Sequence, residues 1–300
     1  MMLSVLKAIY TMADSEKKLD FIRNGIKTFF IVPDVTLIPE DYLEEYFSLG
    51  YECYIIDDDP YCPLSAKIEG IIAAFKDVIL FFFIDRKIQG IEWPTYIRSL
   101  NKKYKSKVRI GVLYTKRSNS PDCRKLEYEY LWDSELICGC IPLEYQKKHN
   151  FLLIKKVLYA NQANGRRKNI RAICGSSCYL NFVYNEYIFK AEIRDVSITH
   201  FSCVFTQKPC EIPLYEKIQN ININIKGQHF NVIGVQALKR NLGEEELYVF
   251  LFRTNEDRNG LNQNIQEKMK TIIYEMTAEK TKDFLDKLFL SIRKRLKDKN

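Results

Sequence analysis

Hydrophobic and polar residues follow two different periods along this chain, and the period changes near residue 162. Between residues 27 and 161, short apolar runs alternate with stretches of helical periodicity. The apolar runs lie at 28–32, 53–56, 78–84, 108–114 and 136–141. The helical stretches lie at 40–49, 64–75, 94–104, 124–132 and 146–161. Continuous apolar strands that alternate with helices are typical of a parallel sheet covered on both faces. We therefore predict a five-stranded, doubly wound α/β domain over 27–161.

Beyond residue 171 the apolar positions recur at every second residue. The segment Ile221-Asn222-Ile223-Asn224-Ile225 is the clearest case, because it places isoleucine on one face of a strand and asparagine on the other. Segments with strand character lie at 171–174, 187–198, 201–205, 217–225, 230–239 and 247–252. Six short antiparallel strands that close on themselves form a small barrel, which we predict for 162–260.

Both ends of the chain are predicted to be helical. Residues 1–26 form an N-terminal helical extension to which the sequence assigns no role. Residues 261–300 have apolar positions on repeating faces and are predicted to form a C-terminal amphipathic helix. We expect this helix to pack on the barrel or on the α/β domain. Self-association of two copies through the helix is the alternative.

Composition is that of a globular protein with two domains. Of the 300 residues, 46% are hydrophobic and 13% aromatic, which is enough for packed cores. The net charge of +8 is concentrated in 147–171 and 293–299, so it indicates local basic surfaces and not a nucleic-acid coat. No apolar run approaches the roughly 20 residues needed to span a membrane. Since we expect neither a transmembrane segment nor a signal peptide, we predict a cytoplasmic protein.

Nine cysteines and three histidines are the residues that a metal site would use. No CxxC pair is present, and the three histidines lie far apart in the sequence. Scattered cysteines in apolar segments are typical of buried, reduced thiols. We predict no metal and no cofactor.

Positive charge is densest in the segment Gly165-Arg166-Arg167-Lys168-Asn169-Ile170-Arg171, at the start of the predicted barrel. The planar guanidinium of arginine grips a phosphate with two parallel hydrogen bonds and also lies flat on a base. About one hairpin later, Asp195-Val196-Ser197 supplies an acceptor and a hydroxyl that suit a purine edge.

An RRxxxR motif before a strand, followed by DxSxxG on the next long strand, resembles the PilZ family of bacterial cyclic di-GMP receptors. The resemblance covers about 165–260. It implies that the arginines clamp the phosphates and stack on guanine, while the aspartate and serine bind the guanine edge. One position departs from the motif, since His200 stands where the family has glycine, and its imidazole either blocks the nucleotide or stacks on a base. The expected ligand-binding residues are Arg166, Arg167, Arg171, Asp195, Ser197 and His200.

The α/β domain resembles the receiver domain of response regulators, but several receiver residues are replaced. Phe82 stands where the phosphate-accepting aspartate is expected, and Ile141-Pro142 stands where lysine-proline is expected. Phosphoryl transfer then lacks a nucleophile and a charge clamp. We therefore predict a pseudo-receiver, although Asp34 and Thr115 match receiver positions.

Two alternatives for the α/β domain stay open. Asp85 lies three residues after Phe82 and is a candidate substitute for the missing acceptor. A small-ligand pocket at the carboxyl ends of the strands is the other, and Asp57-Asp58-Asp59 is placed to line it, unless these residues form a solvated turn.

The predicted function is that of a cyclic di-GMP receptor and signal-transduction effector, which reorients its two domains toward a downstream protein partner that the sequence does not identify. The alternative is a ligand-independent PilZ-like scaffold that has lost nucleotide binding. An enzyme is the weakest hypothesis, because the sequence has no catalytic triad spacing, P-loop or GxGxxG motif.

Overall fold

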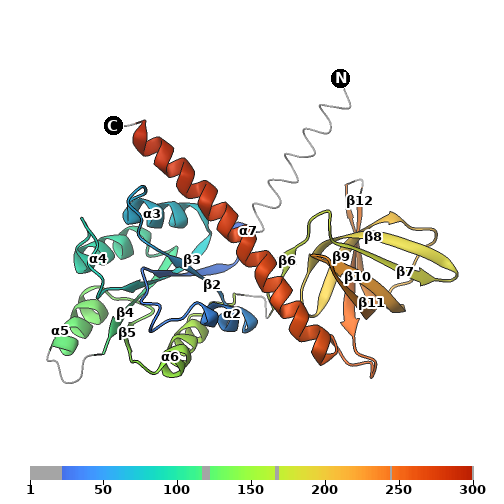
Figure 1. The fold of residues 1–300 in the computed structure, drawn as a ribbon, viewed down its shortest axis with the longest axis horizontal. Coiled ribbons are helices and arrows are strands. Elements are labelled where there is room, and N and C mark those ends of the chain that lie inside the picture. Colours follow the sequence, from blue (N-terminus) through green and yellow to red (C-terminus); the bar gives the residue numbers. More distant parts are fainter. Residues whose placement is uncertain (1–21, 117–121, 166–168, 244, 299–300) are drawn as a thin grey trace. The chain divides into compact units, whose positions relative to one another are not determined.

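The computed structural model describes residues 22–116, 122–165, 169–243 and 245–298 (Figure 1). Two compact units make up the chain: Met1–Lys168 with Thr281–Asn300, and Asn169–Lys280. The predicted N-terminal extension lies almost entirely outside the described residues. Within the described part, no helix combines the length and the apolar character that crossing a membrane requires.

The first unit contains the predicted five-stranded parallel sheet, which is confirmed. Its strands are β1 (Ile26–Ile31), β2 (Glu52–Ile56), β3 (Asp77–Phe83), β4 (Val108–Thr115) and β5 (Cys140–Leu143). They are hydrogen-bonded in the order β2-β1-β3-β4-β5, and every pairing is parallel. The fifth strand begins later than predicted, because Glu135 and Gly139 have positive φ and the chain turns between them.

Helices cover both faces of this sheet. They are α2 (Asp41–Ser48), α3 (Leu64–Ala74), α4 (Trp93–Tyr104), α5 (Asp122–Tyr128), the π-helix η1 (Glu129–Asp133) and α6 (Lys147–Ala160). One hydrophobic core contains residues of α3 and α4, and the other contains residues of α2 and α6. Strand β3 contributes to both, with Leu80 and Phe82 in the first and Ile79 and Phe81 in the second. The fold is therefore doubly wound, as predicted.

The second unit contains a closed six-stranded antiparallel barrel, which confirms the predicted fold class. Its strands are β7 (Tyr179–Tyr184), β8 (Tyr187–Val196), β9 (His200–Gln207), β10 (Lys217–Ile225), β11 (Gln228–Leu242) and β12 (Glu245–Arg253). Hydrogen bonding runs in the order β8-β7-β10-β11-β12-β9, and the β8–β9 pairing closes the ring. A two-residue strand, β6 (Ala172–Ile173), pairs with the end of β8.

The membership of the barrel differs from the prediction at one strand. The segment 171–174 forms only β6 beside the ring, and the sixth barrel strand is β7, which was missed. Leu180 and Phe182 of β7 point into the core, but its outward positions include Tyr179 and Val183, which are also apolar and are exposed. Because both faces carry apolar side chains, the alternation that marks a half-buried strand is absent.

The predicted C-terminal helix is present as α7 (Gln263–Lys297). Its first part, to Lys280, belongs to the barrel unit, where Met269, Ile272 and Ile273 are buried. Its second part belongs to the α/β unit, where Leu285 joins the core that α3 and α4 cover. Each part therefore buries its own apolar stripe.

Candidate ligand site on the barrel

Strand β6 brings Arg171, the one arginine of the motif that the structure describes, to the end of β8. Ala172 pairs with Val196 and Ile173 pairs with Asp195, so Arg171, which directly precedes β6, lies beside this strand end. An Arg171 guanidinium nitrogen is 3.8 Å from Asp195 Oδ1. The Arg171 side chain is 34% exposed. The two residues therefore form a loose ion pair at the surface, longer than a hydrogen bond.

The Asp195 carboxylate has one oxygen that accepts a hydrogen bond and one oxygen that does not. Ser202, opposite Asp195 on β9, donates its hydroxyl to Oδ2. Oδ1 is buried and has no hydrogen-bond partner within the part of the chain that the structure describes. Burying a charged oxygen without a donor costs free energy, so such atoms are uncommon in folded proteins. A donor supplied by a ligand would satisfy this oxygen.

Ser197 and His200 form the turn between β8 and β9. The Ser197 amide donates to the His200 carbonyl at 2.8 Å, and Ser197 Oγ lies 2.9 Å from His200 Nδ1. Thr199 Oγ1 lies at the same distance, 2.9 Å, from His200 Nδ1. Ser197 is fully buried. Its hydroxyl therefore holds the turn together in this structure and does not face solvent.

The imidazole of His200 belongs to this turn. Nδ1 lies between the hydroxyls of Ser197 and Thr199, and Nε2 is buried. His200 is not among the residues with positive φ, so the backbone here does not require glycine. Histidine in place of glycine at position 200 therefore fills space beside the turn but does not strain the backbone.

Three further residues lie at this end of the barrel. Lys280 of α7 donates to the carbonyl of Ile173, the residue that pairs with Asp195. Cys174 has a raised pKa, because it is hydrogen-bonded to Cys178 and buried; the same bond lowers the pKa of Cys178 to about 5. These residues place one more cation and an ionisable thiol pair near the aspartate.

Four of the six predicted site residues are described: Arg171 precedes β6, Asp195 lies on β8, Ser197 lies in the β8–β9 turn and His200 begins β9. Arg166 and Arg167 lie outside the described residues. Sequence reasoning missed Ser202 and Lys280. The position of Ser202 could have been predicted from the sequence. In a hairpin in which Ser197 pairs with His200, Asp195 lies opposite Ser202. No feature of the sequence predicts that Lys280 lies near Ile173, because its position depends on how α7 packs.

The receiver positions of the α/β unit are also described. Phe82 is fully buried in the sheet core, and Pro142 lies within β5. Asp34, Asp85 and Thr115 line one cavity. Asp85, three residues after Phe82 in the sequence, has a carboxylate whose Oδ2 accepts a hydrogen bond from the Thr115 amide at 2.7 Å.

No family model matches the sequence, and no curated protein matches it significantly. Solved structures do match. The PilZ domain of YcgR from Escherichia coli with c-di-GMP is 15% identical over 39% of this chain and 96% of its own, with a TM-score of 0.33. The chain is similar to PilZ-domain proteins.

Two further matches have similar values. The K. pneumoniae MrkH–c-di-GMP complex is 11% identical over 39% of this chain and 54% of its own, with a TM-score of 0.34. The Borreliella burgdorferi PlzA protein with c-di-GMP is 13% identical over 41% of this chain and 48% of its own, with a TM-score of 0.26. The chain thus spans about half the length of these two proteins. With TM-scores this low, the assignment of the site rests on its own residues.

Proposed function

We propose that the barrel unit is a cyclic di-GMP receptor whose site lies at β6 and the β8–β9 turn. The observation that carries the proposal is the buried Oδ1 of Asp195, which has no hydrogen-bond donor among the described residues and lies 3.8 Å from Arg171. An acceptor beside a partly exposed guanidinium suits a ligand that has both N–H donors and negative charge. The guanine edge and the phosphates of cyclic di-GMP combine the two.

Each side chain has a distinct role in this proposal. Arg171 binds a phosphate or stacks on a guanine, together with Arg166 and Arg167 from the segment just before β6. Asp195 accepts from the N–H edge of a guanine, and Ser202 holds its carboxylate in position. Ser197 and His200 shape the turn beside the base. The proposal includes no catalytic step.

We propose further that the receptor acts as an effector. The arginine motif spans the boundary between the two units in sequence, so a ligand bound to it would change how the two units are arranged. The new arrangement would present a surface to a protein partner. Small-angle scattering with and without cyclic di-GMP tests this step, since an unchanged scattering curve on saturation would contradict it.

Calorimetry tests the binding itself. The full chain is titrated with cyclic di-GMP at fixed salt, beside Arg171→Ala, Arg167→Ala and Arg240→Ala. Arg240 is an exposed cation on β11 of the same barrel, so the last variant matches the loss of charge away from the site. We expect binding to be lost in the first two variants and retained in the third. Equal binding by all four proteins would contradict the assignment.

A ligand-independent scaffold is the second candidate, and the closed turn favours it. Ser197 and His200 bond to each other, and the serine is fully buried. His200→Gly separates the two functions. Tighter binding of cyclic di-GMP by this variant would show that the imidazole obstructs a receptor site, whereas no binding by either form would favour the scaffold.

A further inference from the structure

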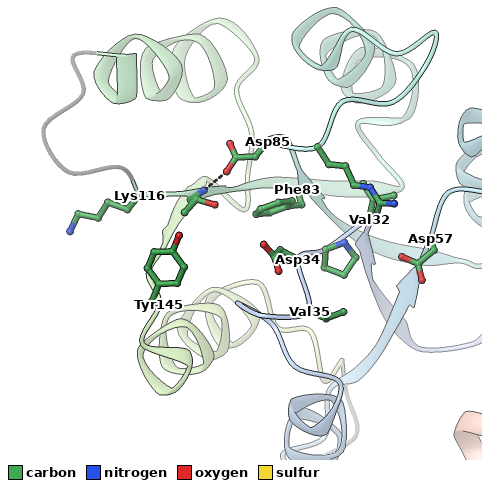
Figure 2. A pocket seen from close by; sticks show the side chains of 11 residues that line it. Val32, Asp34, Val35, Asp57, Phe83, Asp85, Lys116 and Tyr145 are labelled. Carbon is green, nitrogen blue, oxygen red and sulfur yellow. Dashed lines mark hydrogen bonds between the residues drawn. The ribbon is translucent and has the colours of Figure 1, made fainter.

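The cavity that Asp34, Asp85 and Thr115 line in the α/β unit has a volume of about 880 Å³. It opens where β1, β3 and β4 end at their carboxyl termini (Figure 2). In the order β2-β1-β3-β4-β5 the chain leaves β1 toward one side of the sheet and β3 toward the other. The loops that follow these strands separate there and leave a crevice, which is where open α/β sheets bind their ligands. The volume is within the range of small-molecule sites.

The floor and one side of the cavity are apolar. Val32 and Phe83 are buried at the ends of β1 and β3. Val35 and Tyr145 line the cavity but are exposed, Tyr145 by 83%. In addition, Val32 has a φ of 46°, which is unfavourable for a β-branched residue and occurs mostly at functional sites. An exposed aromatic ring above an apolar floor provides a place for the carbon skeleton of a small ligand.

Two carboxylates line this space, each with one oxygen engaged locally. Asp34 Oδ1 accepts from the Thr36 amide at 2.8 Å and from its hydroxyl at 2.6 Å. Asp85 Oδ2 accepts from the Thr115 amide at 2.7 Å. Figure 2 shows the Asp34 carboxylate next to the ring of Phe83, with Tyr145 farther to the left. These hydrogen bonds hold each carboxylate in one orientation, so the position of its second oxygen is fixed as well.

Charge selects the kind of ligand. The lining contains Asp34, Asp57 and Asp85 against Arg86 and Lys116. The lysine forms an ion pair with Glu144 at 2.7 Å, so a carboxylate outside the lining offsets its charge. The cavity is therefore acidic, in a protein with a net charge of +8. Fixed carboxylates in a crevice favour a cation and repel a phosphate.

We propose that this cavity binds a small organic amine. The ammonium group donates to Asp34 and Asp85, and the carbon skeleton packs on Phe83 and under Tyr145. This site is separate from the proposed cyclic di-GMP site and does not depend on it. In this proposal the α/β unit binds an amine, whereas a receiver domain accepts a phosphoryl group.

The test uses the full chain without cyclic di-GMP, with tyramine, agmatine and spermidine as probes in calorimetry and thermal-shift assays. We expect at least one of them to bind and to raise the melting temperature. The compound 4-hydroxyphenylacetate has the ring of tyramine but the opposite charge, so we expect no binding. Absence of binding by all three amines at millimolar concentration would overturn the proposal.

Two matched variants locate the site. Asp34→Asn removes the charge that faces the cavity, and we expect about 10- to 100-fold weaker amine binding, which is typical for loss of a charge-assisted hydrogen bond. Asp58→Asn makes the same change at an exposed residue outside the lining, and we expect no effect. Tyr145→Ala, a change at an exposed side chain, is also expected to weaken binding. Equal binding by Asp34→Asn and Asp58→Asn would overturn the proposal.

Discussion

Replacing Asp195 with asparagine tests the carboxylate on which the barrel site depends. Asparagine has the same shape, and its carbonyl oxygen can keep the hydrogen bond from Ser202. The amide NH₂ then occupies the place of Oδ1, beside Arg171. A guanine edge would meet a donor where it needs an acceptor. The variant therefore removes the proposed contact while the strand pairing is maintained.

The expected loss of affinity follows from the kind of bond that is lost. A hydrogen bond to a charged group contributes about 1.5–3 kcal/mol. Since each 1.4 kcal/mol is tenfold, we expect Asp195→Asn to bind cyclic di-GMP about 10- to 150-fold more weakly. The ion pair with the partly exposed Arg171 adds little to folding, so the free energy of unfolding should change by less than about 1 kcal/mol.

Calorimetry at fixed salt measures the affinity, and urea unfolding measures the stability. Glu192→Gln is the matched control, because it neutralises a carboxylate on the same strand, which lies 3.9 Å from Arg194. We expect wild-type affinity from the control. If Asp195→Asn binds within twofold of the wild type, or if both variants are weakened equally, the role given to Asp195 is refuted.

Three further predictions concern stability. Burial raises the pKa of Asp59, but hydrogen bonds from Lys67 and other donors outweigh it and hold the pKa at about 2. Such a carboxylate stabilises the fold above its unfolded-state pKa of about 4, and this contribution is lost as the pH falls toward 2. Asp59→Asn should therefore cost about 1–2 kcal/mol at pH 7, and urea unfolding should show the difference shrinking below pH 4. Gly111→Ala should lower the melting temperature and cost about 1–3 kcal/mol, because a Cβ would lie 2.8 Å from the Phe81 ring; an unchanged melting temperature would contradict this packing. His200→Gly should cost about 1–2 kcal/mol in urea unfolding, because the turn loses its imidazole bonds; equal stability would show that these bonds do not hold the turn.

The sequence was sufficient to predict the sheet because each strand is a continuous apolar run. Strand β3 buries alternate residues in two cores, so both of its faces must be apolar. Strand β1 has the same pattern, with Phe29 in one core and Phe30 in the other. The barrel was predictable from its period of two wherever one face is polar, as in β10. Strand β7 has apolar residues on its outer face as well, so the period was hidden.

The grouping of the candidate ligand residues was predictable in part because they are close in sequence. A tight turn between two strands places Asp195, Ser197 and His200 at one end of a hairpin, whatever the rest of the barrel does. The depth of each side chain was not predictable. Burial of Ser197 depends on the packing of the whole barrel end, and a motif gives the order of residues but not their exposure.

The two proposed sites use opposite electrostatics. The barrel site combines arginines with one carboxylate whose Oδ1 lacks a donor among the described residues, and it suits a ligand with two negative charges. The cavity of the α/β unit has three aspartates around an apolar floor, and it suits an amine. A phosphate would be repelled by Asp34 and Asp85, and an amine would be repelled by Arg171. Cyclic di-GMP is therefore expected to bind only to the barrel unit, and an amine only to the α/β unit. Titrating the same protein with each ligand in turn shows whether it binds one ligand or both.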